Sequence, residues 1–296
     1  MTAELVLSAE DIVGESPLWV AAESALYWVD IVGSRIHRFE PDTGRHDLWR
    51  TPEYPTSIGL RKDGCFIVGL RQRVTLWRPD GPFETFAVPE PGTPGNRLNE
   101  GAVAPDGSYW VGTMAENIGP DGGPQRMAGD TGHLYRIAPD GGITRLTDDA
   151  FGITNTMVWT DDGRFVTADT IANALYVYDC PSPTALTGRR QFLGPLERGV
   201  PDGSTRDARG NIYNARVAGG ASIACLGPDG RLNSSLELPC RSPTSCVFGG
   251  ADLSTLFVTS SRFGMSARDL AANANDGGLF AVDGVSRGLP TTAFGA

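Results

Sequence analysis

Six oxygen-bearing side chains recur at one position of a repeating pattern in this chain. Each stands eight residues before a turn signal, and the six are Glu15, Thr56, Asn99, Asn155, Asp202 and Thr244. Two of them are carboxylates and two are carboxamides. Burying a pair of carboxylates in a narrow space without a cation is costly for both. Divalent cations such as Ca²⁺, Mg²⁺ and Mn²⁺ prefer such oxygen ligands, so these positions predict one divalent-metal site if the fold brings them together. The alternative is a purely structural channel, in which polar side chains bond to neighbouring backbone.

The elements that must position these residues are short strands joined by turns. Each of the six positions begins a short run, the turn follows, and a second short apolar run comes after it, as in Gly199–Ala215. A further pair of runs separates each unit from the next, and the first turns recur roughly every 40 to 56 residues. Four short strands in each of six units predict an all-β fold, a six-bladed β-propeller that fills residues 1–296 as a single domain. A β-solenoid is the competing architecture, but hairpins of even length favour blades. The first strand of each blade lines the channel of a propeller, so the six positions should meet at one end of it.

Three segments depart from the regular pattern. Residues 115–131 form a long polar, glycine-rich insertion, which we expect to be either a functional lid or disordered. Residues 266–276 lack strand formers and could hold a helical turn. The strand-like segment 4–7 should join the last blade and close the ring, leaving no open edge.

Composition narrows the classes of function. The net charge of −10 and the pI near 4.8 argue against nucleic-acid or membrane partners. No signal peptide or membrane span is evident, and five cysteines without a C-x-x-C pair suggest reduced thiols in a cytoplasmic protein. Only three histidines occur, so any metal would be held mainly by oxygen. We expect a monomer or a small homo-oligomer.

Arg97 adds a positive charge beside the expected metal. It stands two residues before Asn99, so both side chains return to one face of a strand. There it could bind an anionic or carbonyl oxygen, although a surface salt bridge is the alternative. Arg206, in a strand that should line the channel, has no assignable role from the sequence.

Several motifs, in order along nearly the whole chain, resemble the regucalcin (senescence marker protein 30)/gluconolactonase family of six-bladed propellers. They include the segments 14–19 (GESPLW), 97–101 (RLNEG), 201–203 (PDG) and 248–253 (FGGADL). The resemblance implies that the residues Glu15, Asn155 and Asp202 hold one divalent metal. It also implies that Asn99 lies beside the metal and that Arg97 contacts the substrate. Glu100 stands where the family usually has an aspartate that contacts a substrate hydroxyl.

The function that the resemblance implies is hydrolysis of sugar lactones. We therefore expect a metal-dependent lactonase acting on aldonolactones such as pentonolactones or hexonolactones. The metal (Ca, Zn, Mg, Mn or Fe) would polarise the lactone carbonyl, and Asp202 would be the general base for the attacking water. Arg97, Asn99 and Glu100 would bind the sugar. Two alternatives stay open, namely a phosphotriester or other ester hydrolase on the same metal site, and a non-catalytic metal-binding or scaffold propeller.

Overall fold

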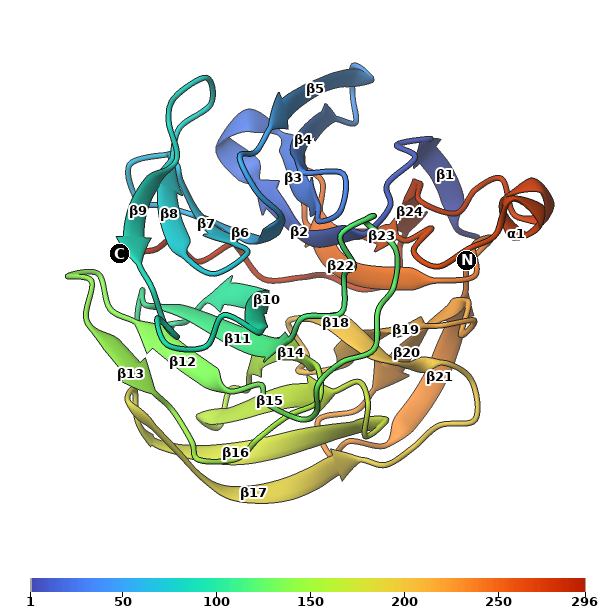
Figure 1. Ribbon diagram of the computed structural model, residues 1–296. Coiled ribbons are helices and arrows are strands. Elements are labelled where there is room, and N and C mark those ends of the chain that lie inside the picture. The colour runs from blue at the N-terminus through green and yellow to red at the C-terminus, as the bar shows by residue number, and fades with distance from the viewer. Residues whose placement is uncertain (1, 296) are drawn as a thin grey trace.

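The computed structural model describes residues 2–295 as six four-stranded antiparallel sheets arranged around a central channel (Figure 1). The expected six-bladed β-propeller is confirmed. Blades 1 and 2 contain β2 (Gly14–Val20), β3 (Ala25–Asp30), β4 (Arg35–Glu40), β5 (Arg45–Arg50), β6 (Pro55–Leu60), β7 (Phe66–Leu70), β8 (Val74–Trp77) and β9 (Glu84–Ala87). Blades 3 and 4 contain β10 (Asn96–Val103), β11 (Tyr109–Ala115), β12 (Leu134–Ile137), β13 (Ile143–Arg145), β14 (Thr154–Trp159), β15 (Arg164–Asp169), β16 (Ala174–Ser182) and β17 (Ala185–Leu193). Blades 5 and 6 contain β18 (Val200–Arg206), β19 (Ile212–Val217), β20 (Ser222–Leu226), β21 (Leu232–Glu237), β22 (Pro243–Gly249), β23 (Thr255–Ser260), β24 (Leu279–Asp283) and β1 (Glu4–Leu7).

The first and the last strand of the chain meet in blade 6. Strand β1 pairs antiparallel with β24, with Glu4 opposite Ala281 and Leu7 opposite Leu279. The expected closure by segment 4–7 is therefore confirmed, and Figure 1 shows β1 beside β24 at one side of the ring. Because β24 would otherwise be an open edge, this pairing satisfies backbone groups that could recruit another chain.

The turns between the first two strands of the blades use left-handed backbone. Gly107, Gly163 and Gly210 have φ values between 75° and 83°, which glycine adopts without a steric penalty. In blades 1 and 6 the corresponding residues are Ser24 and Leu253, with φ values of 47° and 60°. The recurring turn is thus a backbone requirement, and this is why it is visible in the sequence.

All six inner strands among the described residues have an irregular register at the repeated position. The pairing shifts between Glu15 and Leu18 in β2 and between Asn155 and Val158 in β14, and the other four inner strands shift at the equivalent place. Ser16 and Thr156, which each directly follow one of the six repeated positions, have positive φ values of 52° and 60°. A β-bulge changes the direction in which a side chain points. These irregularities therefore direct the side chains at the repeated positions into the channel.

The core consists of layers between neighbouring blades. Between blades 1 and 2, for example, Tyr27 packs against Phe66 with ring centroids 4.6 Å apart, and Phe66 packs against Trp77 at 5.5 Å. Such layers hold adjacent inner strands at fixed distances. The channel walls therefore form a rigid support for the polar side chains that they carry.

Two of the irregular segments expected from the sequence have defined structures. The helix α1 (Ala267–Ala272) begins at the capping box of Ser266 and Asp269, which confirms a helical turn in this region. The glycine-rich loop after β11 arches across the ring in Figure 1 and carries backbone hydrogen bonds, including Gln125 N–H to Asn117 O at 2.9 Å. Within residues 2–295 no helix is long and apolar enough to cross a membrane.

Candidate metal and substrate site

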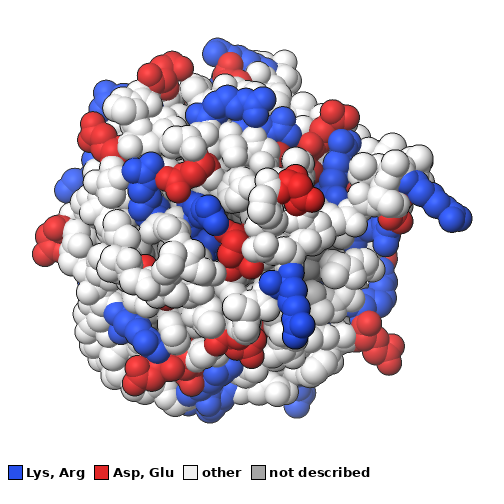
Figure 2. Space-filling model, viewed as in Figure 1, with Lys and Arg blue, Asp and Glu red and all other residues white. Residues whose placement is uncertain are grey.

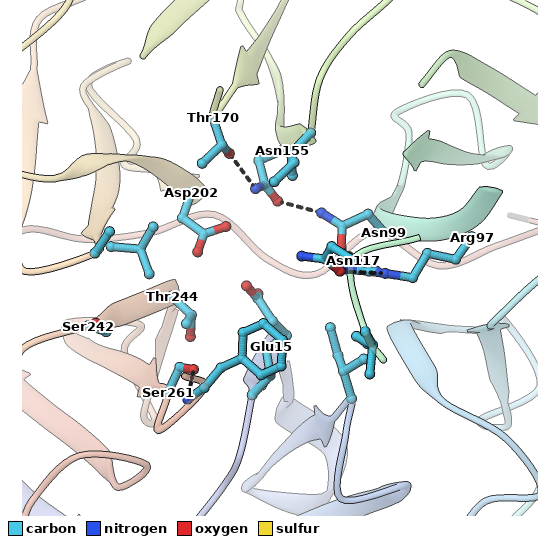
Figure 3. A pocket seen from close by; sticks show the side chains of 17 residues that line it. Glu15, Arg97, Asn99, Asn117, Asn155, Thr170, Asp202, Ser242, Thr244 and Ser261 are labelled. Atoms are coloured by element: carbon cyan, nitrogen blue, oxygen red, sulfur yellow. Dashed lines mark hydrogen bonds between the residues drawn. The ribbon is translucent and has the colours of Figure 1, made fainter. Parts of the chain in front are cut away.

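A cavity of about 230 Å³ lies at the end of the channel where the inner strands begin. Its walls include Glu15, Arg97, Asn99, Asn155 and Asp202, which come from four blades (Figure 3). Thr244 lines the same cavity, so five of the six repeated positions meet there together with Arg97. Apolar side chains complete the wall, namely those of Val13, Ile31, Ile118, Ile153, Val217, Ala218 and Phe263.

Two buried carboxylates point into the cavity from blades 1 and 5. Glu15 and Asp202 are only 8% and 7% exposed, and Figure 3 shows both carboxyl groups directed toward the centre. Burial raises the pKa of Glu15 well above its ordinary value, and the charge of Asp202 adds to this rise. Burial also raises the pKa of Asp202, reinforced by the charge of Glu100 and opposed by a hydrogen bond with Glu15. Without a cation, the protein therefore holds this acid pair at an electrostatic cost.

Two carboxamides face the acids from blades 3 and 4. Asn99 Nδ2 donates to Asn155 Oδ1 at 3.1 Å and to the carbonyl oxygen of Thr154 at 2.9 Å. Asn155 Nδ2 donates to Thr170 Oγ1 at 2.8 Å, and Thr170 Oγ1 donates to the carbonyl oxygen of Pro201 at 2.8 Å. These hydrogen bonds fix both amide planes, and Asn155 Oδ1 keeps a second lone pair for another partner.

Arg97 is buried in the wall and is held by neighbours on two elements. Its Nη1 donates to Asn99 Oδ1 at 2.8 Å, and its Nη2 donates to Asn117 Oδ1 at 3.0 Å. Its Nε lies 3.5 Å from Glu116 Oε1. Burial lowers the pKa of Arg97 to about 10, opposed by the charges of Glu116, Glu15 and Asp202. Arg97 therefore remains charged at neutral pH, and the alternative of an exposed salt bridge is excluded by its 5% exposure.

Three residues singled out in the sequence are placed elsewhere. Thr56 does not line the cavity, because its hydroxyl donates to the carbonyl oxygen of Gly69 in its own blade at 3.3 Å. Glu100 lines a second cavity of about 210 Å³ at the opposite end of the channel, so the structure does not bring it to Arg97 and Asn99. The register shift between Leu98 and Gly101 and the alternation of side chains along β10 turn Glu100 away. Arg206 lines this second cavity too and pairs with Asp161.

The loop after β11 supplies residues that the repeat pattern does not indicate. Asn117 and Ile118 line the cavity, and Glu116 pairs with Arg71 at 2.9 Å as well as with Arg97. These residues lie outside the six repeats, so no equivalent positions point to them. Their only sequence signal is the polar insertion itself, which proves to be part of the wall.

The chemistry of these side chains fits a divalent metal ion. Glu15, Asp202 and the free lone pair of Asn155 Oδ1 present hard oxygen donors in one buried space, and the two acids lack a full counter-charge there. Within residues 2–295, no three His, Cys, Asp or Glu side chains cluster as a metal-binding group, and the carboxamide of Asn155 is the further oxygen donor beside the two acids. A softer, histidine- or thiolate-based centre is inconsistent with these donors.

The fold agrees with a family comparison that covers most of the chain. Residues 13–262 match the family model described as the SMP-30/gluconolactonase/LRE-like region. The chain belongs to this family. The resemblance noted from the sequence motifs is thereby confirmed.

Individual relatives extend over the whole propeller. A 6-deoxy-6-sulfogluconolactonase of Pseudomonas putida is 34% identical over 286 residues, which cover 95% of this chain and 94% of that protein. A pentonolactonase of Haloferax volcanii is 32% identical over 300 residues, covering 98% and 97%. Among solved structures, the calcium-binding protein regucalcin of Agrobacterium tumefaciens superposes with a TM-score of 0.89 at 26% identity, covering 99% of this chain and 97% of that one.

Proposed function

We propose that this chain is a lactonase, a carboxylic ester hydrolase that opens sugar (aldono-) lactones with the help of one divalent metal ion. The observation that carries the proposal is the buried pair of Glu15 and Asp202 facing one cavity with Asn155 and Arg97. The names of the relatives, a sulfogluconolactonase and a pentonolactonase, support the lactone hydrolase class. The calcium-binding description of the structural relative supports a divalent metal.

Each side chain of the site has a role in this proposal. Glu15, Asn155 and Asp202 would hold the metal through carboxylate and carboxamide oxygens. When bound, the metal supplies a Lewis acid that polarises the lactone carbonyl. Asp202 is buried and shielded from bulk water, and its carboxylate oxygen would accept a proton from the water that attacks the lactone carbonyl carbon. The ring C–O bond would then break, and the ring oxygen would leave as a hydroxyl group after taking up a proton.

Arg97 would orient the sugar by direct contact, and Asn99 would do so indirectly. Within the described residues, Arg97 Nη2 donates to Asn117 alone, so its second N–H remains for a substrate oxygen. Asn99 uses both amide hydrogens inside the protein and accepts from Arg97, so it acts by holding Arg97 and Asn155 in place. Polar groups at the base and apolar groups such as Ile31 and Phe263 in the wall suit a small ring with several hydroxyls.

The role in sugar binding that the sequence suggested for Glu100 is not part of the proposal, because Glu100 faces the opposite cavity. The proposal includes a cytoplasmic location, which is supported by five cysteines that are all free thiols. The choice between a monomer and a small homo-oligomer remains a prediction.

A panel of pentonic and hexonic acid lactones tests the function. Acid release should be lost after chelation and restored by one or more of Ca²⁺, Mg²⁺, Mn²⁺, Zn²⁺ and Fe²⁺. Equal hydrolysis before and after chelation would refute the metal requirement. Metal binding without turnover of any lactone would favour a non-catalytic propeller, and turnover of a phosphotriester alone would favour the other hydrolase class.

A further inference from the structure

Arg216, on β19 of blade 5, is a buried cation outside the cavity wall. Its side chain is among the largest fully buried ones, with 1% exposure. Nη2 donates to Asn173 Oδ1 at 2.8 Å and to the carbonyl oxygen of Gly199 at 2.9 Å. Nη1 donates to Asn214 Oδ1 at 3.2 Å, and Nε donates to the carbonyl oxygen of Arg198 at 3.4 Å. One guanidinium thus contacts four neutral acceptors.

The charge of Arg216 has no carboxylate partner in contact. Among residues 2–295, no Asp or Glu oxygen lies within 4.0 Å of its guanidinium, although Asp202 is near enough to raise its pKa. Burial has the larger effect and lowers the pKa of Arg216 to about 10, so the group is charged at neutral pH. An apolar residue of similar volume would avoid the cost of burying this charge.

The acceptors of Arg216 connect to two of the expected metal ligands. Gly199 and its neighbour precede β18, which carries Asp202 three residues later. Asn173 closes a turn with Thr170, since Asn173 N–H donates to Thr170 O at 3.2 Å. Thr170 Oγ1 in turn accepts from Asn155 Nδ2. Arg216 therefore ties the start of blade 5 to the blade 4 turn that supports Asn155.

Asn214 extends this network beneath Asp202. Its Nδ2 donates to the carbonyl oxygen of Asp202 at 3.1 Å and to Ser204 Oγ at 2.9 Å. Thr156 Oγ1 donates to the same Asp202 carbonyl at 2.6 Å. The backbone of Asp202 is thus held by two polar side chains, and one of them is oriented by Arg216.

From this arrangement we propose that Arg216 is a positioning residue of the site. Its planar guanidinium group fixes the separation of Asp202 and Asn155. The inference rests on the proposed function. Groups that support metal ligands from behind typically change metal affinity or activity by roughly 10- to 100-fold when they are removed. The two ligands belong to different blades, so their spacing depends on a contact that spans the blades.

Calorimetry with Ca²⁺ alone tests the role without an activity assay. Arg216→Met should weaken Ca²⁺ binding by roughly 10- to 100-fold. Arg216→Lys keeps the charge but cannot reach the four acceptors, so it should also weaken binding. The control is Arg206→Met, because Arg206 pairs with Asp161 at the other end of the channel, and its Ca²⁺ affinity should match the wild type.

An increase in Ca²⁺ affinity instead of a decrease would overturn the proposal. If Arg216 acted only as a charge that repels the metal, Arg216→Met would bind Ca²⁺ more tightly and Arg216→Lys would bind like the wild type. Unchanged affinity in both variants would refute any role in the site.

Asn173→Gly covers the case in which the arginine variants do not fold. Asn173 has a φ of 50°, which glycine tolerates, so the substitution removes only the side-chain contacts. We expect weaker Ca²⁺ binding and a lower kcat at saturating metal, with KM little changed. Wild-type affinity and kcat in Asn173→Gly would contradict the proposal.

These readouts separate this inference from the proposed function. A wild-type protein that binds Ca²⁺ but opens no lactone would refute the function, while weaker binding by Arg216→Met would still support the positioning role. A wild-type protein that binds no divalent metal would refute both.

Discussion

At the scale of single residues, the site combines charges that oppose one another unless a cation is present. Glu15 and Asp202 are buried with raised pKa values, and Arg97, the one cationic side chain among the described residues of the cavity wall, also faces Glu116. In the proposed function, the same acids that make the metal-free site unfavourable would favour metal binding. A substitution that removes one of these charges should therefore both weaken metal binding and stabilise the metal-free protein.

Glu15→Gln should weaken divalent-metal affinity by roughly tenfold or more, about 1.4 kcal/mol, because a charged ligand is lost. In metal-free buffer at neutral pH the same variant should unfold at a higher temperature than the wild type. The reason is that an acid with a raised pKa in the fold destabilises it when ionised. Calorimetry and thermal unfolding measure the two effects.

Thr56→Val is the matched control for Glu15→Gln, since Thr56 occupies an equivalent repeated position but bonds to Gly69 in its own blade and does not line the cavity. Its metal affinity should equal that of the wild type. Undiminished affinity in Glu15→Gln would remove Glu15 from the metal site.

Asp202→Asn should separate the two roles proposed for this residue. The carboxamide keeps the shape and one oxygen but loses charge and basicity, so metal binding should weaken and be recovered with excess metal. At saturating metal, kcat should stay lower by roughly 10²- to 10⁴-fold if Asp202 is the general base. Steady-state kinetics across metal concentrations measure this. If saturating metal restores the wild-type kcat, Asp202 is only a metal ligand and not the general base.

At the scale of elements, blade 1 contains an aromatic and acid stack that does not belong to the site. His37 stacks on Trp28 at 4.5 Å and on His46 at 5.1 Å, and its Nδ1 lies 2.8 Å from His46 Nε2. Its Nε2 lies 3.0 Å from Asp11 Oδ1. Burial lowers the pKa of His46, with the charges of His37 and Arg35 acting in the same direction and Asp47 opposing. Protonation of His46 is therefore disfavoured in the folded protein.

This shift predicts a pH dependence of stability. Unfolded His46 titrates near 6.5, and the folded group titrates lower, so the unfolded state binds more protons in between. The contribution of His46 should be complete above about pH 6.5 and decline as the pH falls below it. The melting-temperature difference between wild type and His46→Gln should shrink from pH 8 to pH 5. A difference independent of pH would contradict the assignment.

At the scale of the whole molecule, the ring is closed by a strand from the start of the chain. Figure 2 shows positive and negative side chains interspersed over the face that is viewed in Figure 1. Charge is thus distributed over this face, whereas the acid pair is confined to the cavity. Closure matters because the site draws on four blades whose relative positions depend on an unbroken ring.

Removing residues 2–7 should open the edge of β24. Several backbone hydrogen bonds, each worth about 0.5–1.5 kcal/mol, would be lost. The expected loss of unfolding free energy is roughly 2–5 kcal/mol, on the order of 10 °C in melting temperature. Glu4→Ala, which keeps the backbone pairing, is the control and should change little. An unchanged melting temperature after truncation would show that β1 does not contribute to stability.

The sequence by itself determined the blade architecture and most of the site. Left-handed turns require glycine or another residue that tolerates positive φ at regular intervals, so the repeat is visible in the amino-acid sequence. The first strand of each blade must then face the channel. Counting back from the turns identified Glu15, Asn99, Asn155 and Asp202, all of which line the cavity.

Only the tertiary structure decided what depends on bulges and on contacts outside the repeat. An irregular register after Leu98 turns Glu100 to the opposite cavity, although it is adjacent to Asn99 in the sequence. Asn117 reaches Arg97 from an insertion that lies outside the repeated positions. Arg216 is bound by acceptors at the start of its own blade and in blade 4, 17 and 43 residues away in the sequence. Local patterns record backbone requirements, but the direction of a side chain at a bulge and the contacts between blades arise only when the ring is assembled.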